Sequence, residues 1–152
     1  VIIDCEASGL TKESYPIEVG VSFSDDSFSF LIKPFKTWNY WSYDAERIHK
    51  IKREVLFNEG ISCYDAANFL NNQLRGLTLF SDAVDFENFW LNKLFIVAQC
   101  DKLFDVESIY DLSFNHKTYK EIKEKMSVSV ITHRAENDAN LIRSIIEKSM
   151  SN

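Results

Sequence analysis

The chain has 152 residues, of which 45% are hydrophobic and 14% aromatic, and its formal net charge is -6 at pH 7. This length suits one domain spanning residues 1–152, and the composition, with only 4 Gly and 2 Pro, argues against a disordered or linker-rich chain. The negative charge argues against a protein that coats nucleic acid through a basic face. It allows a protein whose clustered carboxylates bind divalent cations, since the cations then supply the positive charge.

Three cysteines, Cys5, Cys63 and Cys100, are widely spaced and form no Cys-x-x-Cys pair. This spacing argues against a zinc site and is typical of buried, reduced thiols. No apolar run approaches the ~20 residues that span a bilayer, and no charged-then-apolar leader precedes the first strand. We therefore expect a soluble, cytoplasmic protein without a membrane partner.

The first part of the chain has the apolar pattern of β-strands. The turn-forming residues 24–27 separate two strands, and Pro34 ends the third because proline cannot donate a ladder hydrogen bond. The pattern predicts an antiparallel meander of three strands at residues 1–4, 17–23 and 28–32.

From Asp44 onward, apolar residues recur at helical spacing, and Gly76 marks one helix end because glycine is frequent directly after a helix. We expect helices at residues 44–55, 62–74, 81–95, 115–125 and 133–147, and short strands at 77–80, within 103–112 and at 128–131. Strands first, then alternating helices and strands, predict an α/β fold with a mixed sheet and helices on both faces.

The most informative stretch is residues 4–10, Asp-Cys-Glu-Ala-Ser-Gly-Leu. In a strand, Asp4 and Glu6 project from the same face, so their carboxylates repel each other unless a cation lies between them. All-oxygen ligation favours Mg²⁺ or Mn²⁺ over zinc. Taken alone, however, the spacing is common, and two solvated acids at a strand end are the more frequent explanation.

A second group of polar residues opens the last predicted helix. His133 lies at the entry to this helix and Asp138 about one and a half turns later, so both could reach a site at the carboxyl edge of a sheet. Taken alone, a surface histidine and one more helix acid explain these residues as well.

Together, the two groups resemble the DEDDh family of 3'-5' exonucleases, which includes polymerase proofreading subunits, ribonuclease T and oligoribonuclease. The first motif of the family is Asp-x-Glu followed by Thr or Ser, Gly and Leu, and the third is His, four residues, then Asp. Between them, residues 16–20 resemble the second strand of the family. Ala45, Ile48, His49 and Ile51 resemble its Ala-x-x-Ile-His-Gly-Ile segment, with Lys50 in place of glycine. The matches to the two motifs are Asp4, Glu6, Ser8, Gly9, Leu10, His133 and Asp138.

The second motif departs from the family pattern. The family has Phe-Asp-x-x-Phe-Leu after the fourth strand, with its Asp as a metal ligand. Aligning Trp90 and Leu91 without a gap places Glu87 at the ligand position. Asp82 or Asp85 could replace it after a small shift of helix register, so the sequence leaves this ligand open.

The resemblance implies a ribonuclease H-like mixed sheet, in which the antiparallel meander is followed by parallel strands. It also implies a metal-dependent exonuclease that removes nucleoside 5'-monophosphates from the 3' ends of single-stranded DNA or RNA. Four acids would hold two Mg²⁺ or Mn²⁺ ions, one activating a water and the other stabilising the leaving 3'-oxygen, while His133 takes the proton of that water. Ser8, Gly9 and Leu10 would meet the terminal nucleotide. The four acids are Asp4, Glu6, Glu87 (alternatively Asp82 or Asp85) and Asp138.

Three alternatives remain at this stage. The irregular second motif supports a catalytically impaired nucleic-acid-binding or regulatory module of the same fold. Clustered acids on a first strand also occur in endonucleases of the superfamily that act on RNA–DNA hybrids, and a scaffold with surface acids is the third. Several relatives are dimers, which allows a homodimer although no residue requires it. The aromatic cluster at residues 38–43, beside the basic segment 47–53, could bind bases and phosphates, but core packing is the more frequent explanation.

Overall fold

The computed structural model describes residues 1–112 and 114–151. Its centre is a five-stranded sheet with the strand order β3-β2-β1-β4-β5. The strands are β1 (Ile2–Ala7), β2 (Pro16–Ser22), β3 (Ser27–Leu31), β4 (Thr78–Ser81) and β5 (Asp105–Ser108). The first three are antiparallel neighbours, whereas β4 pairs parallel with β1 and β5 pairs parallel with β4. The expected meander followed by parallel strands is therefore confirmed.

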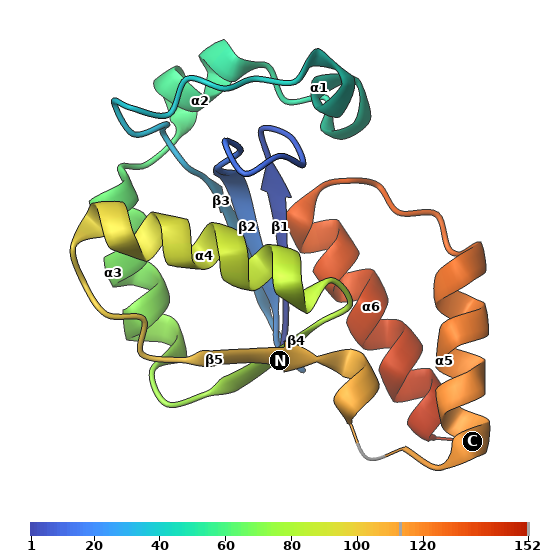
Figure 1. Cartoon of the computed structure of the whole chain (residues 1–152). Coiled ribbons are helices and arrows are strands. Elements are labelled where there is room, and N and C mark those ends of the chain that lie inside the picture. Colours follow the sequence, from blue (N-terminus) through green and yellow to red (C-terminus); the bar gives the residue numbers. More distant parts are fainter. Residues whose placement is uncertain (113, 152) are drawn as a thin grey trace.

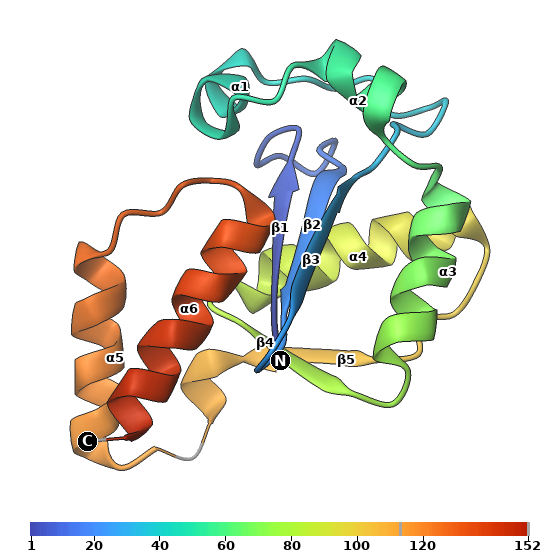
Figure 2. The same cartoon turned by 180° about the vertical axis from the view of Figure 1, so that it is seen from behind.

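Helices cover both faces of the sheet (Figures 1 and 2). On one face, α3 (Cys63–Leu74) and α4 (Val84–Ala98) enclose the larger hydrophobic core. On the other, α6 (Ala135–Met150) lies along β1 and β2, with α5 (His116–Val128) outside it and the short 3-10 turn η1 (Ile109–Asp111) below. Two short helices, α1 (Tyr43–His49) and α2 (Arg53–Glu59), lie beyond the carboxyl end of β1 (Figure 1).

The two faces of β2 differ in chemistry. Its apolar side chains, from Ile17 to Val21, belong to the larger core. The residues between and after them, Glu18, Gly20 and Ser22, lie under α6, since their atoms contact or hydrogen-bond that helix. A helix therefore rests here on polar and small residues rather than on a hydrophobic surface.

The helix expected at residues 44–55 is broken in two. α1 ends at Lys50, which has a left-handed backbone with φ of 60°, and α2 begins at Arg53. This conformation favours glycine. Glycine is also the residue that the Ala-x-x-Ile-His-Gly-Ile segment has at the position of Lys50. Helical spacing of apolar residues continues across the break, which is why the sequence pattern did not reveal it.

The strand expected at residues 128–131 is wrong. α5 continues to Val128, which is 79% exposed, and in the connection that follows Val130 is 82% exposed. Within the described ranges this segment pairs with no strand. β-branched residues favour strands only where a neighbouring strand and a half-buried surface are present. The described helices also include none that combines the length and apolar character needed to cross a membrane.

Candidate metal centre

Three elements bring the acids of the sequence motifs together. β1 carries Asp4 and Glu6, α4 carries Glu87 in its first turn, and α6 carries Asp138 in its first turn. Figure 1 shows that α6 begins beside the carboxyl end of β1. One ligand atom from each of Glu6, His133 and Asp138 lies within 4.8 Å of the other two. Residues from the two ends of the chain thus meet in one cluster.

The burial of Asp4 and Glu6 makes their negative charge costly. Burial raises the pKa of Asp4 well above its usual value, and the neighbouring Glu87 adds to this shift, followed by Glu6. Burial likewise raises the pKa of Glu6 to about 8, and the carboxylate of Asp138 contributes next. Like charges this close are stable together only when protons or cations neutralise them.

Two carboxylate oxygens of these acids lack a hydrogen-bond partner among the described residues. The buried Oδ2 atoms of Asp4 and Asp138 accept no hydrogen bond from the described residues. The other oxygen of Asp138 is held by Thr132, whose backbone N–H and hydroxyl donate to Oδ1 at 2.8 and 2.9 Å. Buried oxygens rarely stay unsatisfied, and oxygen-rich sites of this kind suit a hard divalent cation. The donor set therefore fits a divalent metal ion.

The structure separates the three acids that the second motif left open. Glu87 is 1% exposed, accepts a hydrogen bond from the Ser81 hydroxyl, and adjoins Asp4 closely enough to raise its pKa. Burial also raises the pKa of Glu87 itself to about 7. Asp82 is half-buried at the margin of the cluster, and burial raises its pKa. Asp85 is exposed and borders a separate groove.

His133 lies on the connection that precedes α6. Its backbone is left-handed, with φ of 56°, so the chain turns sharply between Thr132 and the helix. The half-buried side chain lines a cavity that Glu6 also lines. His133 therefore belongs both to the acid cluster and to the wall of this cavity.

That cavity has a volume of about 360 Å³ and opens beside the acids. It is lined mainly by apolar and aromatic groups, among them Leu10, Ala45, Ile48 and Trp90. His49, which also lines it, is buried, and its Nδ1 accepts a hydrogen bond from the backbone N–H of Ile51 at 3.0 Å. Its Nε2 is also buried and has no hydrogen-bond partner among the described residues.

The loop between β1 and β2 presents Leu10 at the rim of the cavity. Leu10 is 76% exposed, while Ser8 is fully buried and exchanges hydrogen bonds with the backbone of Tyr15 at 2.9 and 3.1 Å. Lys93 of α4 donates to the carbonyls of Lys12 and Ser14. These hydrogen bonds hold the loop against α4 and so fix the backbone position of Leu10.

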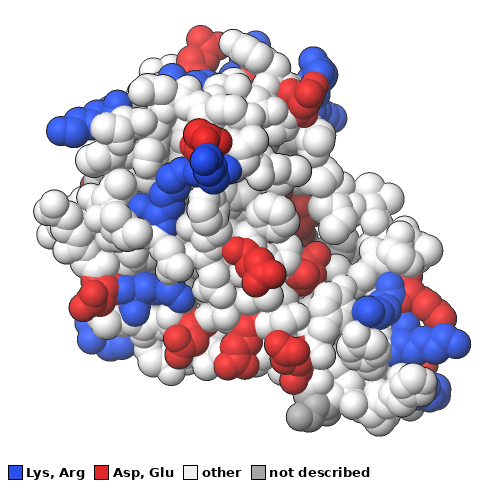
Figure 3. All heavy atoms as spheres, viewed as in Figure 1, with Lys and Arg blue, Asp and Glu red and all other residues white. Residues whose placement is uncertain are grey.

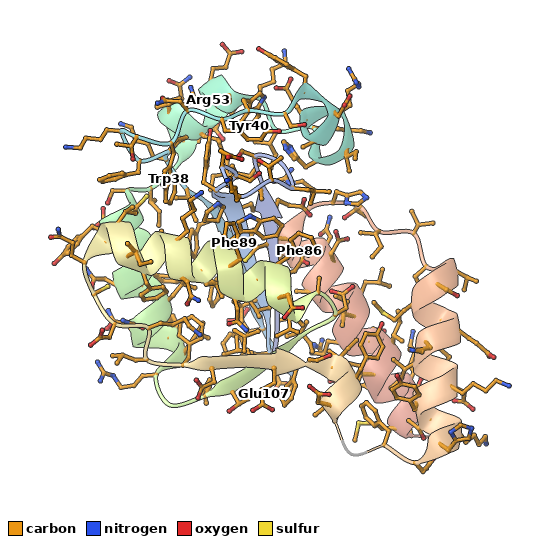
Figure 4. The ribbon with its side chains drawn as sticks, in the orientation of Figure 1. Trp38, Tyr40, Arg53, Phe86, Phe89 and Glu107 are labelled. Atoms are coloured by element: carbon orange, nitrogen blue, oxygen red, sulfur yellow. The ribbon has the colours of Figure 1, made fainter. Side chains whose placement is uncertain are left out.

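Figure 4 shows Phe86 and Phe89 on the side of α4 that faces the segment bearing Tyr40. These phenylalanines, with Leu10 and Trp90, line the groove that Asp85 borders.

The aromatic residues at 38–43 are divided between core and surface: Trp38 and Trp41 pack against the larger core, whereas Tyr43 is 71% exposed. Trp38 is 5% exposed and stacks on Tyr15 with a ring-centre distance of 5.3 Å. Arg53 donates to the Tyr15 hydroxyl and to the Trp38 carbonyl, so this cation is already used (Figure 4). The core-packing explanation holds for these residues, whereas Tyr40 lines the cavity.

The charged side chains are unevenly distributed. On the face seen in Figure 3, acidic groups gather over β5 and the start of α4, while basic groups lie above α4, beside one end of β5 and over α5. A phosphate approaching this face would meet negative charge unless cations intervened.

No model of a known protein family matches the sequence, and no curated protein matches it. Solved structures do match. The E. coli exonuclease I complex with a dT13 oligonucleotide aligns with a TM-score of 0.72 at 13% identity, over 98% of this chain and 40% of that one. The zinc-bound form of an E. coli exonuclease I complex with single-stranded DNA aligns with a TM-score of 0.71 at 11% identity, over 98% and 40%. The chain has the fold of exonuclease I.

A third match extends this result beyond E. coli. Exonuclease I from Methylocaldum szegediense aligns with a TM-score of 0.71 at 11% identity, over 96% of this chain and 39% of that one. The chain spans about two fifths of the length of these exonuclease I proteins. The resemblance to 3'-5' exonucleases drawn from the motifs is thus confirmed at the level of the fold.

The raised pKa values predict how stability depends on pH. A carboxyl group whose folded-state pKa lies above its unfolded value stabilises the fold fully below the unfolded pKa, and this contribution is lost as pH rises through the folded pKa. For Glu6 and Glu87, the folded values are about 8 and about 7. We therefore expect the metal-free protein to melt at a progressively lower temperature as the pH rises from 5 to 8.5.

Thermal unfolding in EDTA and in Mn²⁺, across this pH range, tests the prediction. Because cations replace the lost protons, the stabilisation by Mn²⁺ should be small at pH 5 and largest at pH 8.5. A melting temperature in EDTA that rises steadily with pH would contradict it.

Proposed function

We propose that the chain is a metal-dependent 3'-5' exonuclease that removes nucleoside 5'-monophosphates from single-stranded DNA or RNA. The observation that carries the proposal is the adjacency of two features. A buried acid cluster with two unpartnered carboxylate oxygens lies directly beside a largely apolar cavity of about 360 Å³. This volume lies in the range of pockets that hold small organic ligands, and it suits one nucleoside.

The acids would hold the metal ions, and Glu87 is the candidate of the second motif with the best support. It is buried against Asp4, whereas Asp85 is exposed. We therefore assign metal binding to Asp4, Glu6, Glu87 and Asp138. Two Mg²⁺ or Mn²⁺ ions in such a site supply Lewis-acid stabilisation of the charge that develops on the phosphate and the leaving 3'-oxygen.

The remaining residues act on the substrate and on protons. His133 would accept the proton of the attacking water at a ring nitrogen, since its side chain adjoins the acids and also lines the cavity. The terminal base would enter the cavity, with Leu10 at the rim separating it from the preceding nucleotide.

The preference for single strands is inferred from the fold. Two of the exonuclease I structures hold single-stranded DNA or an oligonucleotide. The cavity admits one base with its sugar, and a paired partner base would have to be stripped away first. A homodimer is an additional expectation that solution scattering can test.

A 5'-labelled oligonucleotide tests the proposal. With Mg²⁺ or Mn²⁺, linear single-stranded DNA or RNA should shorten one nucleotide at a time, while a circular oligonucleotide stays intact because it has no 3' end. The Asp4→Asn variant should shorten neither linear DNA nor linear RNA. Cleavage of the circle would indicate an endonuclease instead.

One observation favours a second candidate, a catalytically impaired binding module. Glu87 replaces the usual aspartate, and one of its oxygens is already bound by Ser81. If the wild type binds Mn²⁺ and the oligonucleotide but shortens neither DNA nor RNA with either cation, this second function replaces the first.

A further inference from the structure

The start of α6 is capped by a residue that is distant in sequence. Arg134, at the N-cap position, makes no side-chain capping hydrogen bond. Instead, the backbone N–H of Ala135 donates to Oε1 of Glu18 at 2.6 Å, across a separation of 117 residues. The first N–H groups of a helix lack partners within the helix, and a carboxylate there also interacts favourably with the helix dipole. A strand of the sheet therefore supplies the cap.

Arg134 completes the contact from the opposite side. Its Nε and Nη2 donate to Oε2 of Glu18 at 3.0 and 2.7 Å. The Glu18 side chain is 2% exposed and that of Arg134 is 50% exposed, so the guanidinium covers a buried carboxylate. With both oxygens engaged, Glu18 is not available as a metal ligand although it lies near the acid cluster.

The same face of β2 lets α6 approach unusually closely. A Cβ atom on Gly20 would lie 2.3 Å from the backbone carbon of Ala135 and from the backbone nitrogen of Glu136. Further along, Arg143 of α6 donates to the Ser22 hydroxyl at 2.8 Å. The helix is thus fixed on the strand by backbone contact and by hydrogen bonds, which have a defined register, more than by apolar packing.

This junction joins the two halves of the acid cluster. Glu18 is the β2 residue directly opposite Glu6 on β1. Arg134 directly follows His133, and Asp138 lies one turn further along α6. The ion pair therefore links β2, beside Glu6, to the start of α6, where His133 and Asp138 lie.

We propose that Glu18 and Arg134 are positioning residues that hold the start of α6 against β1 and β2 and so preassemble Glu6, His133 and Asp138 for cation binding. The inference rests on the proposed function in assigning a catalytic cation to this cluster. Residues that orient metal ligands without touching the metal commonly have such a role.

Two substitutions and a control test the proposal. Glu18→Gln keeps a hydrogen-bond acceptor but removes the charge, and Arg134→Gln removes the guanidinium from a half-exposed position. Each should weaken Mn²⁺ binding, measured by calorimetry, by about 10- to 100-fold, which is the usual effect of removing a group that orients a ligand. Exonuclease kcat should fall with it, while KM for the oligonucleotide stays unchanged. The double variant should lose no more than either single one, because the two residues act as a unit.

Glu136→Gln is the matched control. Glu136 also lies in the first turn of α6 and accepts hydrogen bonds from Ser27 and Ser29 of β3, yet it does not contact the Glu18 pair. Its substitution should leave Mn²⁺ affinity and kcat unchanged. If Glu18→Gln and Arg134→Gln lower only the melting temperature and bind Mn²⁺ like the wild type, the pair is merely stabilising and the proposal is wrong.

Amide hydrogen exchange of the metal-free protein separates this proposal from the proposed function. Exchange at residues 135–138 should be faster in Arg134→Gln than in the wild type and in Glu136→Gln, whether or not the protein is a nuclease. Unchanged exchange would overturn the positioning role. A wild type that binds no Mn²⁺ would contradict the proposed function instead.

Discussion

Glu87→Gln should lower exonuclease kcat/KM by about 1,000-fold, whereas Asp85→Asn, two residues earlier on α4, should leave it unchanged. Loss of a cation ligand removes several kcal/mol of transition-state stabilisation, and about 4 kcal/mol corresponds to that factor. Glutamine keeps the size of Glu87 and can still accept from Ser81, so the fold should persist. Rates on labelled single-stranded DNA, together with Mn²⁺ calorimetry, measure both variants.

Two other results would change the assignment. If Asp82→Asn abolishes activity as strongly as Glu87→Gln, then Asp82 contributes a ligand from the margin of the cluster. If Asp85→Asn is inactive, the register of α4 in solution differs from the one described here.

Gly20→Ala should destabilise the protein by about 3 kcal/mol, a large value for one methyl group but within the range of severe overpacking. The added Cβ would meet the backbone of Ala135 and Glu136 at 2.3 Å, and a backbone cannot move aside as a side-chain tip can. α6 would have to shift, and Mn²⁺ affinity should fall as well. Urea unfolding and calorimetry measure the two effects.

Gly76→Ala is the comparison variant. Gly76 has a φ of 76° and no atoms within 4 Å of an added Cβ, so only backbone strain opposes the substitution. A cost of about 1 kcal/mol, without any change in Mn²⁺ affinity, is expected. If Gly20→Ala is no more harmful than Gly76→Ala, the close approach of α6 does not control the site.

Local patterns were sufficient for much of the fold. The alternation in β1 placed Asp4 and Glu6 on one face, and the helix expected at residues 62–74, with Gly76 just past its end, closely matches α3. Helical spacing could also have distinguished the acids of the second motif. Glu87 shares a face with the buried residues Trp90, Leu91 and Leu94, three, four and seven positions later, whereas Asp85 does not.

Other features depend on contacts between distant segments. Nothing in its neighbourhood distinguishes Glu18 from an ordinary strand acid, because its partners lie more than 110 residues away. The strand expected at residues 128–131 was wrong for the same reason, since a strand requires a neighbour that sequence spacing does not reveal. His49 was noted only as part of a resembling segment, and its free Nε2 became evident from the burial of the ring.

The capping of α6 by β2 also has a consequence for folding kinetics. A contact across 117 residues closes a loop that comprises most of the chain. Such contacts form late, because the chain loses the entropy of loop closure before the contact contributes any stabilisation. The β1–β2–β3 meander, built from neighbouring segments, can form early. Partly folded species are therefore expected to carry Asp4 and Glu6 on an ordered strand while lacking His133 and Asp138, so that competence to bind cations appears in the final step of folding.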